Sequence, residues 1–246
     1  MAYAVITREA EAAAPYVAAL APLGLEGLAL PVTRMAPALD PGELVRALAH
    51  GGYAAIVVAS ARAARALQAA RGPAPLPEVW AVGPATARAL AAAGIPARVP
   101  PVARDAVTLA TMLVAERSLA GHRVLVPRAE DGRDEAIAIL REAGAVVDAI
   151  TAYRTVPAPA DDPDLAHGLA LLRRGEVAVC AVFAPSQVAA LEALVGVRRI
   201  TARFAAIGET TAAALRNAGV TVIAIADTPT PEGLAKAVSA VYPLRS

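Results

Sequence analysis

The sequence predicts an α/β protein built from two similar, doubly wound parallel-sheet domains. Short apolar runs bounded by Gly and Pro alternate with alanine-rich stretches, which is typical of buried parallel strands and their crossover helices. This alternation occurs twice along the chain, and 246 residues are enough for two domains of ordinary size. Alanine favours helices more than any other residue, so we expect helices between the strands.

Ten short segments fit buried strands, in two sets of five. They are Tyr3–Thr7, Glu26–Pro31, Ala54–Val58, Val79–Val82, Arg98–Val99, Val124–Val126, Val146–Ala152, Val177–Phe183, Ala205–Ile207 and Thr221–Ala226. Two helix starts carry capping signals. Asp40 precedes Glu43 by three residues, as in a capping box, and Thr230 precedes a first-turn proline.

Two kinds of segment are repeated along the chain. The first is a strand that ends in arginine, at Arg8 and Arg128, followed by a helical stretch, a second extended segment and a proline. The second contains a turn that opens a helix, at Gly83 and Gly208. The order along the chain is first, second, first, second, so two ways of pairing the repeats into domains are open.

The proline-rich connections favour a pairing of the outer repeats with each other. Residues 31–41 and 153–163 both read as extended, and they follow equivalent strands of the first repeat. If the outer repeats close into one domain, both connections run between the same two domains and form a two-stranded linker, whereas pairing in sequence needs only one crossover. We therefore expect a discontinuous outer domain of residues 1–35 and 160–246, an inserted domain of residues 38–155, and interdomain linkers at residues 33–40 and 153–160.

Composition argues against several classes of function. A net charge of +1 provides no basic field for nucleic acid. No apolar run approaches the roughly 18 residues of a membrane-spanning helix, and the N-terminal residues do not resemble a signal peptide, so we expect a cytoplasmic protein without membrane partners. The single cysteine, Cys180, excludes an internal disulfide, and we interpret it as a buried strand residue.

Cofactor and metal motifs are missing from the sequence. There is no phosphate-binding loop, no Gly-rich dinucleotide fingerprint after the first strand, and no spacing of ligands typical of a metal site. We therefore expect no cofactor and no metal. Since no long exposed apolar stripe is evident, we also expect a monomer.

Ligand-binding residues are expected beyond the carboxyl ends of the strands, where open parallel sheets bind their ligands. The helices that start there offer unpaired backbone N–H groups, which suit carboxylates and phosphates. The candidate binding residues are Arg8, Ser60, Ala61, Thr86, Arg128, Pro185, Ser186, Gly208, Thr210 and Thr211. For each Ser or Thr taken alone, an ordinary helix cap is the better interpretation, and it is the duplicated set of turns on one side of two sheets that favours binding.

Tyr153 is a candidate of a different kind. Its counterpart in the outer repeat is Thr33, so the repeat does not require an aromatic ring at this position. One interpretation is a linker residue that packs its ring against a neighbour. The other is a phenol in the interdomain cleft that donates a proton or a hydrogen bond. Since no other acid–base pair is evident, an enzyme of this kind would act mainly by positioning a reactive polyanion.

Seven segments together resemble uroporphyrinogen-III synthases over residues 3–240. They are Thr7-Arg8, Gly121–Arg128, Leu140–Val147, Ala152–Thr155, Phe183–Ser186, Ala206–Ala212 and Ala226–Leu234. The resemblance implies two α/β domains joined by a two-stranded connection. It also implies a cofactor-free enzyme of tetrapyrrole biosynthesis that closes hydroxymethylbilane, a linear tetrapyrrole with eight carboxylates, into uroporphyrinogen III. The family's reaction loses water and inverts the last pyrrole ring.

The resemblance also assigns residues. The family's most cited tyrosine falls on Tyr153, with a proposed role in departure of the substrate hydroxyl, and threonines of two turns fall on Thr86 and on Thr210 and Thr211. Ala184 stands where the family often has Ser or Thr, which leaves Ser186 and backbone N–H groups as donors in that turn. A transient contact with hydroxymethylbilane synthase, which supplies the substrate, is a further expectation.

Two other functions fit parts of the pattern. A bilobal, hinge-type binding protein for small molecules, without catalysis, has a similar two-domain design, although the sequence shows no export signal. A nucleotide-dependent transferase with two Rossmann-like domains is the second alternative, and the missing Gly-rich fingerprint argues against it.

Overall fold

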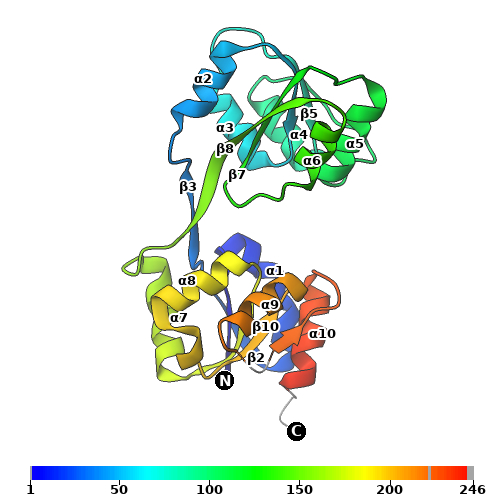
Figure 1. The fold of residues 1–246 in the computed structure, drawn as a ribbon. Helices are drawn as coiled ribbons and strands as arrows, with labels where there is room; N and C mark the ends of the chain where they lie inside the picture. Colours follow the sequence, from blue (N-terminus) through cyan, green and yellow to red (C-terminus); the bar gives the residue numbers. More distant parts are fainter. Residues whose placement is uncertain (1, 221–222, 243–246) are drawn as a thin grey trace. The chain divides into compact units, whose positions relative to one another are not determined.

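The structure is a computed structural model that describes residues 2–220 and 223–242. The chain divides into two units (Figure 1): unit 1 is Met1–Arg34 with Val156–Ser246, and unit 2 is Met35–Thr155. Each unit holds a sheet of parallel strands with helices on both faces, and unit 1 is discontinuous in sequence. The predicted fold class is therefore confirmed.

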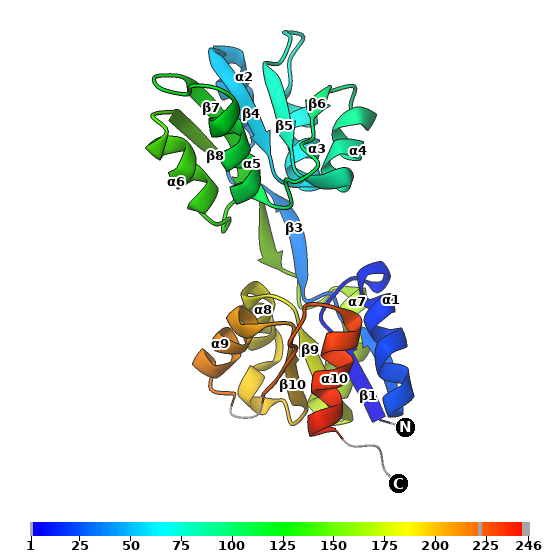
Figure 2. The same ribbon diagram turned by 90° about the vertical axis from the view of Figure 1, so that its right-hand side faces the viewer.

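Unit 1 contains a five-stranded sheet of order β11-β10-β9-β1-β2, in which all neighbours are parallel. Its helices form two layers, with α1 and α10 packed on one face and α7, α8 and α9 on the other (Figure 2). The elements are β1 (Ala2–Ile6), α1 (Ala10–Leu20), the 3-10 turn η1 (Ala21–Leu23), β2 (Leu25–Ala29), α7 (Pro163–Arg174), β9 (Val177–Val182), α8 (Pro185–Val195), η2 (Val197–Arg199), β10 (Arg203–Ala206), α9 (Glu209–Asn217), β11 (Ile223–Ile225) and α10 (Pro231–Val241).

Unit 2 contains a six-stranded sheet of order β3-β8-β7-β4-β5-β6, and the pairs from β8 to β6 are parallel. Helices α2, α3 and α4 pack on one face and α5 and α6 on the other. The elements are β3 (Thr33–Pro37), α2 (Gly42–His50), β4 (Tyr53–Val58), α3 (Ala61–Ala70), β5 (Glu78–Ala81), α4 (Gly83–Ala92), β6 (Ala97–Arg98), α5 (Ala106–Glu116), β7 (Arg123–Ala129), α6 (Glu135–Glu142) and β8 (Val146–Pro157).

The two sheets share one winding, which explains the repeats in the sequence. Unit 1 runs β2-β1-β9-β10-β11 and unit 2 runs β8-β7-β4-β5-β6, so the first repeat supplies two strands and the second repeat three. In each sheet the order of winding reverses once, between β1 and β9 in unit 1 and between β4 and β7 in unit 2. We call these two places the switch points, since ligands of open α/β sheets bind beside such reversals.

All ten expected strands are present with bounds close to those predicted, and one more, β3, is found. Thr221 and Val222, the start of the last expected strand, lie outside the described residues. The connecting segments expected to be extended are in fact paired: β3 lies beside β8, the backbone N–H of Ala158 donates to Val32 O at 2.8 Å, and Arg154 Nε donates to Pro37 O at 3.1 Å. Pairing satisfies backbone groups that single extended segments would leave to water.

One of the two capping predictions is wrong. Helix α2 begins one residue later than expected, with Pro41 at its N-cap, and Asp40 binds the backbone N–H of Gly42 and the side chain of Arg46 instead. The second prediction is confirmed, because Thr230 Oγ1 caps α10 by accepting from the N–H of Gly233 at 3.1 Å.

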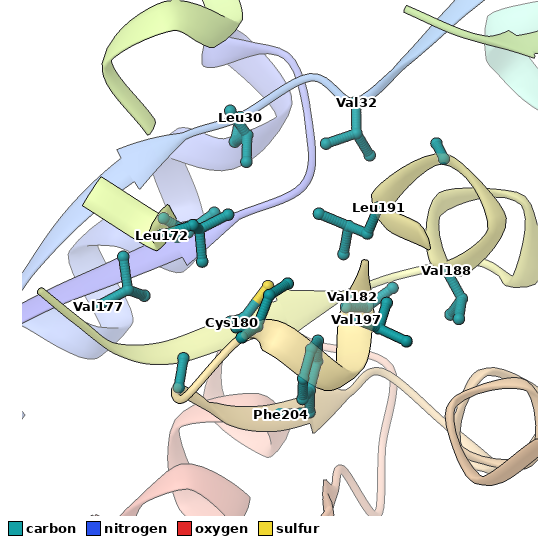
Figure 3. Packing of buried hydrophobic residues seen from close by; sticks show 14 of the residues in the cluster. Leu30, Val32, Leu172, Val177, Cys180, Val182, Val188, Leu191, Val197 and Phe204 are labelled. Carbon is teal, nitrogen blue, oxygen red and sulfur yellow. The ribbon is translucent and has the colours of Figure 1, made fainter. Parts of the chain in front are cut away.

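Cys180 lies in the middle of the unit 1 core (Figure 3). Its side chain is fully buried on β9 in a cluster that includes Leu172, Val182 and Phe204. Burial removes the thiolate from water and raises the pKa of the thiol to about 12. The interpretation of Cys180 as a buried strand residue is confirmed.

A polar cluster ties together three strands at the amino edge of the unit 2 sheet. The Tyr53 hydroxyl donates to Asp148 Oδ2 at 2.7 Å, Arg123 forms an ion pair with Asp148, and the Arg123 guanidinium lies 4.4 Å from the centre of the Tyr53 ring. Burial raises the pKa of Tyr53 to about 12. Burial also opposes ionisation of Asp148, but the hydrogen bonds from Tyr53 and Arg123 outweigh it and lower the pKa of that carboxyl.

We expect Asp148→Asn to lower the free energy of unfolding of unit 2 by about 1–3 kcal/mol at pH 7. The pKa of Asp148 in the folded protein is below the value of 3.8 expected for the unfolded chain. The ionised carboxylate therefore stabilises the fold fully above pH 3.8, and this stabilisation is lost as the pH falls through the lower pKa of the folded state. Wild type and variant should accordingly have similar stabilities in acid. Urea unfolding followed by the fluorescence of Trp80, the only tryptophan, measures this difference. The control is Asp40→Asn, in an exposed ion pair, which should leave stability nearly unchanged because solvent screens such pairs. Equal losses in both variants would contradict the assignment.

We expect Cys180 to resist thiol reagents in the native protein at pH 8 and to react fully in urea, because its thiol is buried and its pKa is raised. The rate of modification by a chromogenic disulfide measures this. Native labelling at the rate of a free cysteine would show that unit 1 opens far more often than its core packing indicates.

Candidate functional site

The candidate residues of unit 2 gather at the carboxyl edge of its sheet. Ser60 follows β4, Arg128 lies near the end of β7, and these two strands meet at the switch point. Tyr153 lies on β8, on the far side of β7, and its hydroxyl reaches to 3.2 Å from Ser60 Oγ. The structure therefore brings together three residues that are well separated in sequence.

Ser60 is both a helix cap and the partner of Tyr153. Its Oγ accepts a hydrogen bond from the N–H of Ala63 at 3.1 Å and so caps α3. This bond uses a lone pair of Ser60 and leaves its proton free for the Tyr153 oxygen. The ring of Tyr153 packs against the cluster under α2, α3 and α4, while its hydroxyl stays at the sheet edge. The structure therefore shows a packed ring whose hydroxyl lies beside Ser60.

The other candidates of unit 2 differ in how available they are. Thr86 is 4% exposed, and its hydroxyl makes no hydrogen bond within the described part of the chain. Arg128 forms an ion pair with Asp134, whose side chain is 80% exposed. A ligand carboxylate at Arg128 would have to compete with this exposed aspartate. Ala61 is the first residue of α3 and offers its backbone only.

In unit 1 the candidates occupy the corresponding edge. Arg8 follows β1, and Pro185 and Ser186 open the helix after β9, so they flank the second switch point. Thr210 and Thr211 lie at the start of α9, the helix that follows the neighbouring strand β10. Thr210 is exposed and Thr211 is 3% exposed, because adjacent helical residues face different directions.

Helices α4, α8 and α9, like α1 and α6, start at these edges without a side-chain cap. The N-cap residues are Val82 for α4, Ala184 for α8 and Gly208 for α9, and none of them receives a hydrogen bond on its side chain. The unpaired N–H groups of these first turns suit an anion, although Pro84 and Pro185 have no N–H and the N–H of Gln187 already donates to Ala184 O at 3.1 Å. At Gly208 the backbone is extended and an added Cβ would meet nothing within 4 Å, so neither conformation nor packing requires a glycine there.

A hydrogen-bond network beside Ala184 was not predicted from the sequence. Gln187 Oε1 accepts from the N–H of Phe183 at 2.8 Å and lies 2.7 Å from Thr7 Oγ1, which is also 2.9 Å from Ala181 O. Thr7 is 1% exposed. A glutamine three residues after an N-cap was the available signal, because the side chain at that position often reaches back to the start of its helix.

Arg8 lies on an aromatic surface that was also not predicted. Its guanidinium is 5.0 Å from the ring centre of Phe183 and 5.6 Å from that of Tyr16, and the two rings are in edge-to-face contact at 4.6 Å. These residues come from β1, α1 and the end of β9, so no local sequence pattern could have indicated this contact.

Four surface hollows among the described residues contain none of the candidates. One of about 490 Å³ lies at the opposite edge of the unit 1 sheet, between the ends of α7 and α8, and is lined by residues including Leu172, Glu192 and Arg199. Within residues 2–220 and 223–242, no group of three or more His, Cys, Asp or Glu side chains could hold a metal ion. No helix in the same part of the chain is long and apolar enough to cross a bilayer.

Comparison with known families decides the relationship of this chain. The family model described as uroporphyrinogen-III synthase HemD matches residues 14–236. The chain belongs to the uroporphyrinogen-III synthase family. The matched range contains all of the candidate residues except Arg8. A comparison with curated proteins gives no significant match.

Solved uroporphyrinogen-III synthases share the fold. A mutant of the enzyme from the extremely thermophilic bacterium Thermus thermophilus is 24% identical with a TM-score of 0.53, and the match covers 98% of this chain and 97% of that chain. The enzyme from Helicobacter pylori 26695 is 18% identical with a TM-score of 0.64, and the match covers 98% of this chain and 100% of that chain. At these identities the likeness concerns the fold alone.

Ser60 and Ala184 provide a reciprocal test of helix capping. Their backbones are nearly identical, with φ −152° and ψ 153° at Ser60 and φ −157° and ψ 153° at Ala184. We expect Ser60→Ala to destabilise unit 2 by about 1 kcal/mol and Ala184→Ser to stabilise unit 1 by a similar amount. Trp80 fluorescence reports on unit 2 and Cys180 labelling on unit 1 during urea unfolding. A destabilising effect of Ala184→Ser would show that Gln187 already occupies the capping position.

Proposed function

We propose that this chain cyclises hydroxymethylbilane to uroporphyrinogen III, with loss of water and inversion of the last pyrrole ring, in tetrapyrrole biosynthesis. The family match over residues 14–236 carries this proposal. The match does not favour the alternative of a binding protein without catalysis, and it gives no support to a nucleotide-dependent transferase.

Binding of the substrate rests on its carboxylates in this proposal. Each unit offers its own receptors at the carboxyl edge: Arg128 and the start of α4 in unit 2, and Arg8 with the starts of α8 and α9 in unit 1. Helix N-termini and guanidinium groups both favour carboxylates. Ser186, Thr210 and Thr86 add hydroxyl groups beside these receptors. Spreading the binding over many groups suits an enzyme whose task is to hold one conformation of a flexible, reactive chain.

Tyr153 is the proposed catalytic residue. Its phenol donates a proton to the hydroxyl group of the substrate as the C–O bond breaks, water leaves, and electrons from the pyrrole nitrogen form an azafulvenium cation that keeps its N–H proton. The phenolate that remains accepts a hydrogen bond from Ser60 Oγ, 3.2 Å away, whose proton is free because Ser60 accepts from Ala63. Ring closure joins two pyrrole units at a pyrrole carbon, and the proton that this carbon then loses returns to the phenolate. The packed ring of Tyr153 keeps its hydroxyl in place between these steps.

Partners and location complete the proposal. We propose that the protein acts as a monomer in the cytoplasm and receives hydroxymethylbilane through a transient contact with hydroxymethylbilane synthase. The instability of the substrate supports such a contact, because unassisted hydroxymethylbilane closes to the symmetric I isomer.

A coupled assay tests the function. Hydroxymethylbilane is generated by its synthase in the presence of this protein, the products are oxidised, and the uroporphyrin isomers are separated by chromatography. We expect a shift from the I isomer to the III isomer. Persistence of the I isomer alone, with folded protein present, would overturn the proposal and favour the binding protein.

The same assay tests Tyr153. We expect Tyr153→Phe to lower the rate of III-isomer formation about a hundredfold, the loss typical of a missing proton donor. The comparison variant Ser186→Ala removes one neutral hydrogen-bonding group at the other sheet and should cost no more than about fivefold. Near-wild-type rates for both would remove Tyr153 from the role of proton donor.

A further inference from the structure

Arg8 is held by an unusual share of the protein's aromatic side chains. The whole chain has two Phe, five Tyr and one Trp. Two of these, Phe183 and Tyr16, meet edge to face beneath one guanidinium group. Tyr16 is 7% exposed, so its ring is a fixed part of the α1 packing and not a loose surface contact. This arrangement lies directly at the unit 1 switch point.

An aromatic support leaves the hydrogen-bonding capacity of arginine unused. The rings attract the cation through their electron-rich faces without pairing its charge with a carboxylate, so its N–H donors stay available to a bidentate carboxylate. Among the described residues, the guanidinium of Arg8 makes no ion pair or hydrogen bond, whereas its repeat counterpart Arg128 is paired with Asp134. The two equivalent arginines thus differ: one is neutralised by a neighbour and the other is held in place without being neutralised.

Gln187 fixes the support itself. Its carboxamide oxygen receives the N–H of Phe183 and lies within hydrogen-bonding distance of Thr7, which directly precedes Arg8. Gln187 therefore locks the end of β9 to the end of β1 at the point where Phe183 meets Arg8.

We propose that Tyr16, Phe183 and Gln187 are positioning residues that hold Arg8 as a preformed receptor for one carboxylate of the substrate. The proposal rests on the proposed function for the identity of the substrate and adds residues to which no role was assigned. Preformation matters because a free arginine side chain would lose rotamer freedom on binding, whereas this one has already been ordered by folding. The receptor belongs to unit 1 alone, at the edge formed by β1 and β9.

The test compares KM with kcat. We expect Arg8→Met to raise the KM for hydroxymethylbilane roughly 10- to 100-fold, as for the loss of hydrogen bonds between charged groups, with little change in kcat. Tyr16→Leu removes the ring but keeps an apolar side chain, and should raise KM about two- to fivefold. Tyr16→Phe retains the ring and should restore the wild-type KM. Circular dichroism and Cys180 labelling confirm folding of each variant.

The matched control is Arg98→Met. Arg98, on β6 of unit 2, lies 4.5 Å from the ring centre of Trp80 and is paired with Glu116. The same substitution there removes a contact between arginine and an aromatic ring outside the candidate site. We expect no change in KM. If Arg8→Met and Tyr16→Leu leave KM as unchanged as Arg98→Met does, the receptor is overturned while the cyclase activity stands.

Direct binding separates the receptor from the reaction. The probe is uroporphyrin III, an octacarboxylate, and the readout is its stabilisation of the protein against heat. We expect the stabilisation of wild type to fall in Arg8→Met and to persist in Arg98→Met. Should the wild type form no III isomer, the proposed function fails, and this measurement still decides the receptor: equal stabilisation of wild type and Arg8→Met would overturn it.

Discussion

The parallel pairing of β1 with β9 is the contact on which unit 1 depends. It joins the beginning of the chain to a strand far along the sequence; Thr7 and Ala181, which are hydrogen-bonded beside it, are 174 residues apart. This pairing closes the outer repeats around the inserted unit and creates the reversal of winding at which Arg8 and the start of α8 meet. Without it, Phe183 and Gln187 would have no fixed relation to Arg8, and α1 and α8 would have no common sheet to pack on.

The two switch points are versions of one structure with different side chains. Ser60 and Ala184 have almost the same backbone angles, but only Ser60 caps its helix and contacts a tyrosine. Arg8 and Arg128 end equivalent strands, but one rests on aromatic rings and the other is paired with an aspartate. The repeated fold thus presents two equivalent sheet edges with different side chains: a serine–tyrosine pair at one and an arginine on aromatic rings at the other.

Helix capping shows how stability and binding compete at these edges. A capped helix start is more stable by about 1 kcal/mol, yet a cap occupies the N–H groups that could bind an anion. Helices α1, α2, α4, α6, α8 and α9 begin without side-chain caps, whereas α3, α5, α7 and α10 are capped by Ser60, Asp105, Asp162 and Thr230. Apart from α2, the uncapped helices follow interior strands of the two sheets, where most candidate residues lie; the capped helix α3, with Ser60, also follows one.

The sequence by itself determined the strands, the permuted repeats and the fold class, because apolar runs and turn residues act over a few positions. It also determined that Ser60, Arg128 and Tyr153 lie at one sheet edge, because a parallel sheet brings the carboxyl ends of its strands together. It misplaced the start of α2, since Asp40 has competing partners in Gly42 and Arg46. Only the tertiary structure decided the aromatic support of Arg8 and the bonds of Gln187. These contacts join β1, α1 and β9, and their energy depends on the mutual orientation of segments that no local pattern relates to one another.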